Sequence, residues 1–291
     1  MNEQKTLLDR RTLELFERAA TTPQDPDAVD RDNGELIERI APVVDDLFRL
    51  YFRLEVEGID GVPRGKALLV MNHEAGITFV QTIGMGARWY LRRGTDDRIV
   101  AMTHDAMFEV PLLGNLLATF GAVRASPINA ANAFARGLKV LVAPGGNLEA
   151  FRTFSERYTI KFGGHKGWAR LALREGVPVV PVVFTGSHET FFVLNDGREL
   201  VRLLGLKRLL RIDTFPLFLG LPWGVGLGPL FHLPLPSKCV IRFLDPVPVP
   251  QVAPGEVVDP DAVDDLYVRV TSKMQAALYE LAEQRRLPVL G

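Results

Sequence analysis

The sequence predicts an α/β fold, a single three-layer domain with a mixed, largely parallel central sheet flanked by helices. Short apolar runs, typical of buried strands, alternate with longer segments whose apolar residues recur at helical spacing. A chain of 291 residues is long enough to bury a large core. The composition, 47% hydrophobic and 24% charged, is that of a globular protein and not of a disordered or collagen-like chain.

Six strands and five helices make up this prediction. The strands are expected at residues 53–57, 67–71, 98–103, 138–143, 177–184 and 239–244. The helices are expected at residues 78–92, 106–118, 166–175, 198–210 and 261–285. The last helix has the clearest boundaries, because Asp259 can cap it, Pro260 suits its first turn and Pro288 follows its end.

Residues 1–34 are expected to form an N-terminal helix, over 5–20, and a polar, proline-containing linker. Residues 35–291 then form the main domain, which opens with an amphipathic helix over 36–54. Its apolar side carries Ile37, Ile40, Ala41, Val44, Leu47, Phe48 and Tyr51, and its polar side carries Arg39, Asp45, Asp46, Arg49 and Arg53. Pro42 either kinks this helix or begins a second segment. The apolar side either packs on the core or lies in the plane of a membrane.

One segment interrupts the alternation of strands and helices. Residues 214–237 contain no Asp, Glu, Lys or Arg, but they include many prolines and glycines. An interior proline costs an α-helix about 3 kcal/mol, so this run does not sustain a straight membrane-spanning helix. We expect an apolar, loop-rich surface that either packs against the protein or dips into a membrane interface, where Trp223 is favourable.

Composition and spacing exclude several function classes. A net charge of −1 lacks the basic excess of a nucleic-acid-binding protein. A single cysteine, Cys239, rules out a disulfide framework and a cysteine-rich zinc site, and it is expected in the core. The histidines show no metal-ligand spacing, and there is no G-x-S-x-G motif of a serine hydrolase. The charged N-terminus lacks the apolar core of a signal peptide, which favours the cytosol or the cytosolic face of a membrane.

The sharpest candidate for chemistry is Asn72-His73, which directly follows the apolar run 67–71. In α/β folds the carboxyl ends of strands border the ligand crevice. Histidine is also the commonest general base near neutral pH. On spacing alone, His73 is either a general base or a structural histidine at a strand end.

Four blocks of sequence resemble the glycerolipid acyltransferase superfamily, which includes 1-acylglycerol-3-phosphate acyltransferases and a diacylglycerol acyltransferase branch. In chain order they are VEGIDGVPRGKALLVMNHEAG, FEVPLLGNLLATFGAVRAS, VLVAPGGNLEAF and HKGWARLALREGVPVVPVVFTGSHETFF. Each block alone is weakly specific, but four in the same order across much of the chain form a strong signal. The Pro-Gly-Gly-x-x-Glu form of the third block is similar to the diacylglycerol branch. The resemblance implies a glycerol-phosphate acyltransferase-like fold, with residues 35–291 as the acyltransferase domain.

The resemblance implies that His73 removes the proton from the acceptor hydroxyl, which then attacks the acyl thioester directly, with Asn72 beside it as a substrate-binding residue. Members usually read His-x4-Asp, and the aspartate fixes the tautomer of the imidazole. Here the matching position is Thr78, whose hydroxyl accepts a hydrogen bond but carries no charge. Loss of the orienting aspartate costs a serine-protease triad roughly 10⁴ in rate. An active enzyme and a catalytically impaired relative therefore both stay open.

The third and fourth blocks add substrate-binding candidates. Gly145 and Gly146 let the backbone approach a ligand and adopt positive φ. Glu149 is expected to accept a hydrogen bond from the acceptor hydroxyl, and His188 is expected to line the cleft. The alternative for the third block is a plain strand-to-helix turn, with a first-turn glutamate that the helix dipole favours.

The second block bears on the acceptor. Phosphate-accepting members carry an arginine at its end, where this chain has Pro127, and Arg124 lies three residues earlier. Arginine recognises phosphate through a bidentate fork, so its displacement favours a neutral, diacylglycerol-like acceptor. Arg124 then contacts a phosphate of coenzyme A or is a surface charge.

The sequence therefore predicts an O-acyltransferase that moves a fatty acyl group from acyl-CoA, its co-substrate, to a lipid alcohol without a metal or other cofactor. We expect a peripheral (monotopic) protein on the cytoplasmic side of a membrane, held through residues 36–54 and 214–237. The alternatives are a catalytically impaired lipid-binding relative and a phospholipid acyltransferase of the lysophosphatidate type that uses Arg124.

Overall fold

The computed structural model describes residues 9–30, 33–205, 214–250, 252–253, 256–287 and 289–291. The strands of its main sheet are β1 (Glu55–Glu57), β2 (Leu68–Met71), β3 (Ile99–Thr103), β4 (Ala122–Arg124), β5 (Lys139–Val142), β6 (Val179–Thr185) and β10 (Val240–Phe243). Their order across the sheet is β1-β10-β6-β2-β5-β3-β4. The five strands from β6 to β4 are parallel, whereas β10 is antiparallel to β6 and carries β1 parallel to itself. The mixed, largely parallel sheet is thus confirmed.

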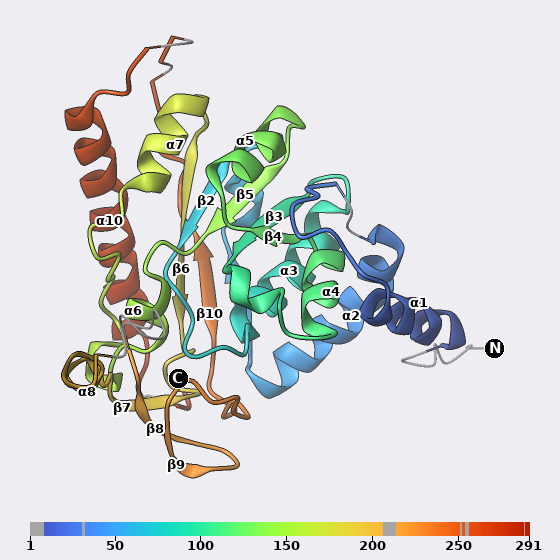
Figure 1. The fold of residues 1–291 in the computed structure, drawn as a ribbon, viewed down its shortest axis with the longest axis vertical. Coiled ribbons are helices and arrows are strands. Elements are labelled where there is room, and N and C mark those ends of the chain that lie inside the picture. Colours follow the sequence, from blue (N-terminus) through green and yellow to red (C-terminus); the bar gives the residue numbers. More distant parts are fainter. Residues whose placement is uncertain (1–8, 31–32, 206–213, 251, 254–255, 288) are drawn as a thin grey trace.

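Helices cover both faces of this sheet (Figure 1). One face packs against α5 (Pro127–Ala135), α7 (Gly167–Glu175) and α10 (Pro260–Glu283), and the other against α2 (Gly34–Tyr51) and α3 (Val80–Arg93). The central strand β2 contributes side chains to the hydrophobic cores on both faces of the sheet, because successive side chains of a strand point to opposite faces. Leu68 and Val70 join the first core, and Leu69 and Met71 join the second. Both faces of β2 are therefore buried, which explains its continuous apolar run.

The predicted elements of the main domain are largely confirmed. All six predicted strands lie in the main sheet, and the helices predicted at 78–92, 166–175 and 261–285 are α3, α7 and α10. The helix predicted at 106–118 is wrong as one element, because Pro111 and the positive φ of Leu112 separate η2 (Asp105–Met107) from α4 (Leu113–Thr119). The helix predicted at 198–210 is α8 (Arg198–Leu203), and residues 206–210 lie outside the described part. The prediction missed β4, α5 and β7 (Phe192–Asn195), and it gave α6 (Gly146–Ala150) only as an alternative, the strand-to-helix turn of the third block.

The N-terminal region contains α1 (Arg10–Thr21), which confirms the predicted helix as far as the structure describes it. Residues 5–8 of the prediction lie outside the described residues. Helix α2 runs through Pro42 as one element, so no second segment begins there. The expectation that Asp45 lies on a polar side of α2 is wrong. Asp45 is buried, and its Oδ1 lies 2.9 Å from Nη2 of Arg88, because α3 packs along α2 and supplies this partner. At the other side, Leu47, Leu50 and Tyr51 are exposed.

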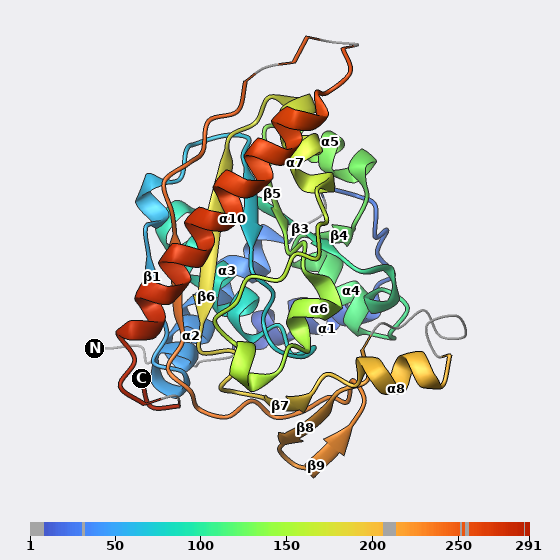
Figure 2. The same ribbon diagram turned by 90° about the vertical axis from the view of Figure 1, so that its left-hand side faces the viewer.

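The charge-free segment 214–237 contains two strands, a correction to the loop-rich expectation. Strands β8 (Leu217–Gly220) and β9 (Gly224–Leu227) form an antiparallel hairpin, which pairs with β7 (Phe192–Asn195) in a second sheet. This sheet lies at the lower end of the molecule in both views (Figures 1 and 2). The exposed large apolar side chains of the segment are Leu217, Leu219, Leu221, Trp223, Val225, Leu227, Leu230, Phe231 and Leu233.

The exposed apolar end of α2 adjoins this segment. The hydroxyl of Tyr51 donates a hydrogen bond to the carbonyl of Pro234 at 2.9 Å, and Arg53 Nη2 donates to the carbonyl of Pro236 at 3.0 Å. We call the exposed residues of the segment, together with Leu47, Leu50 and Tyr51, the apolar face. Within the described ranges, no helix has the length and hydropathy needed to cross a bilayer.

Candidate active site

Three neighbouring parallel strands, β5, β2 and β6, end at the same edge of the sheet. His73 follows the middle strand, β2, after one intervening residue. The Pro-Gly-Gly turn at 144–146 follows β5, and residues 186–189 follow β6. Three of the four blocks found in the sequence therefore meet at the edge where α/β folds place their ligand sites.

The side chain of Asn72 ties the end of β2 to strand β6. Its Nδ2 donates to the carbonyl of Phe184 at 3.1 Å, and its Oδ1 accepts from the N–H of the same residue at 2.8 Å. The side chain is fully buried. Its amide is occupied by β6, contrary to the expectation that it binds substrate, because a buried amide must satisfy both ends within the protein.

His73 is partly buried and is held at two points. Its backbone N–H donates to Oε2 of Glu149 at 2.9 Å. Its ring nitrogen Nδ1 lies 2.8 Å from the carbonyl oxygen of Glu74. A carbonyl only accepts, so Nδ1 carries the proton and the neutral ring accepts a proton at Nε2. Burial lowers the pKa of His73, and the Glu74 carbonyl offsets part of that effect. The ring is thus neutral, as a base must be, at neutral pH.

Thr78 lies in the partly exposed turn between His73 and α3. The expected role of Thr78 was to orient the imidazole. The partner at Nδ1 is the Glu74 carbonyl instead, one residue away in the chain. A catalytic contribution from Thr78 stays a prediction.

Glu149 is fully buried, and the chain itself occupies both of its carboxylate oxygens. Oε1 accepts from Arg152 Nη1 at 3.1 Å and from the backbone N–H of Lys161 at 2.9 Å, while Oε2 accepts from His73. Burial raises the pKa of Glu149 and lowers that of Arg152, and in both cases the pairing opposes the effect. Glu149 therefore holds the backbone of His73 instead of contacting an acceptor hydroxyl, which corrects the expectation for this residue.

The two glycines of the third block have different reasons to be glycine. Gly146 has φ of 48°, the left-handed conformation that was expected. Gly145 has φ of −68°, so the expectation of positive φ is wrong for it. A Cβ at Gly145 would overlap the side chain of Glu149. Gly145 thus makes room for the carboxylate that supports His73.

The remaining predicted residues do not line an open cleft together. His188 is buried, with Nε2 2.9 Å from the carbonyl of Glu149, so it supports α6 instead of lining a cleft. Arg124 ends β4 at the edge of the sheet, with β5 and β3 between it and β2. Its Nη1 lies 2.8 Å from Oδ2 of Asp27, and its Nε lies 3.5 Å from Oδ1 of Asp105. Arg124 therefore has acidic partners of its own.

Sequence reasoning missed three residues that hold the site. Arg152 is fully buried and forms an ion pair with Glu149, which lies three positions earlier in α6. Ser187 accepts from the N–H of Ala75 at 3.1 Å. The carboxylate of Glu74 binds the first turn of α3. The contact of Ser187 joins positions that are 112 residues apart, so no local pattern reveals it.

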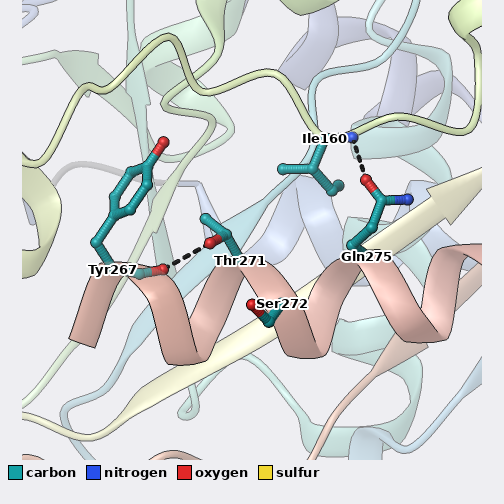
Figure 3. Close-up of a pocket in the computed structure, with 5 residues that line it drawn as sticks. All are labelled: Ile160, Tyr267, Thr271, Ser272 and Gln275. Atoms are coloured by element: carbon teal, nitrogen blue, oxygen red, sulfur yellow. Dashed lines mark hydrogen bonds between the residues drawn. The ribbon is translucent and has the colours of Figure 1, made fainter. Parts of the chain in front are cut away.

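A separate cavity of about 250 Å³ lies on α10 (Figure 3). Ile160, Tyr267, Thr271, Ser272 and Gln275 line it, and the N–H of Ile160 donates to Oε1 of Gln275 at 2.9 Å. It contains none of the predicted site residues. Among the described residues, no group of three or more His, Cys, Asp or Glu side chains is placed to hold a metal ion.

Comparison with known proteins agrees with the geometry. The model of the family described as Acyltransferase matches residues 53–185, which include β2, His73, the Pro-Gly-Gly turn and β6. In this region the chain is similar to the glycerolipid acyltransferase superfamily. The crystal structure of the 1-acyl-sn-glycerophosphate (LPA) acyltransferase PlsC from Thermotoga maritima has the same fold, with a TM-score of 0.51 and 14% identity, over 96% of this chain and 91% of that one.

Two curated relatives match most of the chain. An uncharacterized protein of Mycobacterium tuberculosis (strain H37Rv) is 29% identical over 247 residues, which are 85% of this chain and 66% of that protein. The human protein named DGAT1/2-independent enzyme synthesizing storage lipids is 25% identical over 248 residues, 83% of this chain and 70% of that protein. The chain thus spans just under two thirds of the length of the mycobacterial relative.

Proposed function

We propose that this protein is an O-acyltransferase that moves a fatty acyl group from acyl-CoA to the hydroxyl of a neutral, diacylglycerol-like lipid, with His73 as general base. The observation that carries the proposal is the contact between His73 Nδ1 and the Glu74 carbonyl. It leaves the lone pair of Nε2 to accept a proton, at the strand edge where ligands bind in this fold class.

The reaction follows from this tautomer. Nε2 takes the proton of the acceptor hydroxyl as its oxygen attacks the thioester carbonyl, and the ring becomes an imidazolium. The tetrahedral intermediate then breaks its carbon–sulfur bond, and the coenzyme A thiolate takes the proton from the imidazolium. An ester and free coenzyme A result, and His73 is neutral again. A thioester is an activated donor, so positioning and base catalysis are the protein's main tasks.

A neutral acceptor is favoured over a phosphorylated one by the position of Arg124. Its guanidinium lies at the sheet edge and is paired with Asp27, so it is not poised beside His73 as a phosphate ligand. A relative whose name states that it synthesises storage lipids supports the same choice.

Membrane contact through the apolar face completes the proposal. Its residues carry no charge, include Trp223 and Phe231, and come from two segments that Tyr51 joins at Pro234. Interfacial aromatic and aliphatic side chains of this kind bury themselves at the boundary of headgroups and acyl chains. A peripheral, monotopic position on the cytoplasmic side of a membrane gives the enzyme access to a lipid acceptor.

The deciding experiment supplies purified protein with radiolabelled acyl-CoA and vesicles that contain diacylglycerol, monoacylglycerol or lysophosphatidate. We expect ester formation on a neutral alcohol, and a fall in kcat of about 10²- to 10⁴-fold in His73→Ala. His104→Ala, which changes an exposed histidine, is the matched control. Preference for lysophosphatidate would replace the neutral acceptor, and vesicle binding without turnover on any acceptor would indicate the catalytically impaired relative.

A further inference from the structure

The side chain of Glu74, the residue after the base, binds helix α3. Its Oε2 accepts a hydrogen bond from the backbone N–H of Gln81 at 2.6 Å, and its Oε1 accepts from Oγ1 of Thr82 at 2.6 Å. Both groups lie in the first turn of α3. Phe79, which precedes the helix, has φ of 53° and its side chain does not cap the helix. Glu74 is 2% exposed and therefore caps α3 from a distance, where the positive end of the helix favours its carboxylate.

The backbone of Glu74 holds the imidazole. Its carbonyl oxygen lies 2.8 Å from Nδ1 of His73. The N–H of the same peptide group, which belongs to Ala75, donates to Oγ of Ser187 at 3.1 Å. A planar peptide fixed at its N–H and at the preceding side chain holds its carbonyl in one direction. That direction selects the tautomer of His73 with the proton on Nδ1.

We propose that Glu74 is the positioning residue of this active site, and that it supplies through its anchored carbonyl the orientation that His-x4-Asp members obtain from an aspartate. This proposal rests on the proposed function of His73. The simpler alternative is that Glu74 only caps α3, so that its loss lowers stability and nothing else.

Loss of the capping carboxylate has a specific consequence for the base. The first turn of α3 and the peptide between residues 74 and 75 lose their common anchor, and the carbonyl no longer faces Nδ1. A neutral histidine in water prefers the proton on Nε2, which is the nitrogen that has to accept a proton here. A fraction of the molecules would then be unable to act as a base, so kcat falls while substrate binding is unchanged.

Glu74→Gln tests this, with Asp259→Asn as a matched control that makes the same carboxylate-to-amide change at the cap of α10. We expect kcat of Glu74→Gln to fall by at least about tenfold, within the roughly 10⁴-fold loss of a triad without its aspartate, at an unchanged KM. The acidic limb of the pH profile of kcat/KM should also move to lower pH, since the carbonyl contact favours the charged ring. Asp259→Asn should keep the wild-type kcat and profile.

A second measurement does not depend on turnover. ¹⁵N NMR of histidine-labelled protein reports which ring nitrogen carries the proton, and His73→Ala identifies the resonance. Wild type should show the Nδ1–H form, and Glu74→Gln should show a mixture with the Nε2–H form. Failure of the proposed acyl transfer would leave this result intact. Wild-type kcat in Glu74→Gln, or an unaltered tautomer alongside a loss of stability, would overturn the proposal.

Discussion

Oε2 of Glu149 lies 2.9 Å from the backbone nitrogen of His73, so a buried ion pair supports the main chain of the candidate base. Removing one partner of a buried pair costs about 3–5 kcal/mol, because the other charge is left uncompensated. Glu149→Gln should therefore lower the free energy of unfolding by roughly that amount in urea titrations.

Two variants sharpen this comparison. Glu14→Gln breaks the exposed pair with Arg10 and should cost less than about 1 kcal/mol. Glu149→Gln combined with Arg152→Met removes both buried charges and should recover part of the loss. Additive losses in the double variant would show that the two side chains do not stabilise each other.

The pH dependence of catalysis follows from the lowered pKa of His73. A base has to be neutral, so activity is lost as pH falls through this pKa. Because burial lowers the pKa below the ordinary value of about 6.5, the acidic limb of kcat/KM should lie below that pH. A profile measured from pH 4.5 to 8 on saturating vesicles checks this. An acidic limb above pH 7 would contradict a desolvated base.

Thr78→Asp restores the residue usual in the superfamily and tests whether position 78 faces the imidazole. A carboxylate within reach of the ring favours its charged form, so the pKa of His73 should rise and the acidic limb should move to higher pH. Thr78→Asn has the same shape without the charge and should leave the limb in place. Identical profiles for the two variants would show that residue 78 does not act on His73.

His232 makes stability sensitive to acid. It is buried against Phe191, with ring centroids 3.8 Å apart, and burial lowers its pKa to about 4. The unfolded chain takes up a proton near pH 6.5, but the folded chain does so only near 4, so stability is complete above 6.5 and is lost as pH falls between these values. With about 1.4 kcal/mol for each pH unit, the loss amounts to roughly 3 kcal/mol. In denaturant titrations between pH 6.5 and 4, the free energy of unfolding of His232→Phe should fall less than that of wild type, by this amount. His104→Gln should match wild type.

The apolar face should bind membranes. Trp223→Asp with Val225→Asp places two charges on it, and both side chains are exposed at the β8–β9 hairpin of the second sheet. We expect co-sedimentation with phosphatidylcholine vesicles to fall by at least about tenfold, since burying a charge in the interface is costly. Val257→Asp changes a side chain that is 91% exposed outside the apolar face, and it should bind as wild type does. An equal loss of vesicle binding in Val257→Asp and in the double variant would point to a general effect of added charge.

Much of the fold could be predicted because buried parallel strands leave apolar runs, such as residues 67–71, that can be recognised without knowing their partners. Strand β4 was missed and helix α6 was only an alternative, because three and five residues are too few to show a period. Strands β7, β8 and β9 were missed. The prolines and glycines of segment 214–237 suggested loops there, and the pairing of β8 with β7 depends on residues distant in the chain.

The site was predicted less fully than the fold. Motif spacing located His73 and the Pro-Gly-Gly turn, and both lie at the same edge of the sheet. The spacing did not indicate which atoms face one another. Glu149 was expected to face a substrate and instead faces the backbone of His73, because Arg152 is buried with it. The carbonyl that holds the imidazole belongs to a main-chain group, and main-chain groups leave no signature in a sequence.

Strand β1 joins the sheet only through β10, which lies almost two hundred positions further along the chain. During synthesis on the ribosome, the five parallel strands are complete long before their antiparallel neighbour emerges. Until then β6 is an open edge with unpaired amides and carbonyls, a surface prone to associate with other nascent chains. That edge closes only once β10 is made, so a stop codon ahead of residue 240 would leave an aggregation-prone product that still contains His73 and the Pro-Gly-Gly turn.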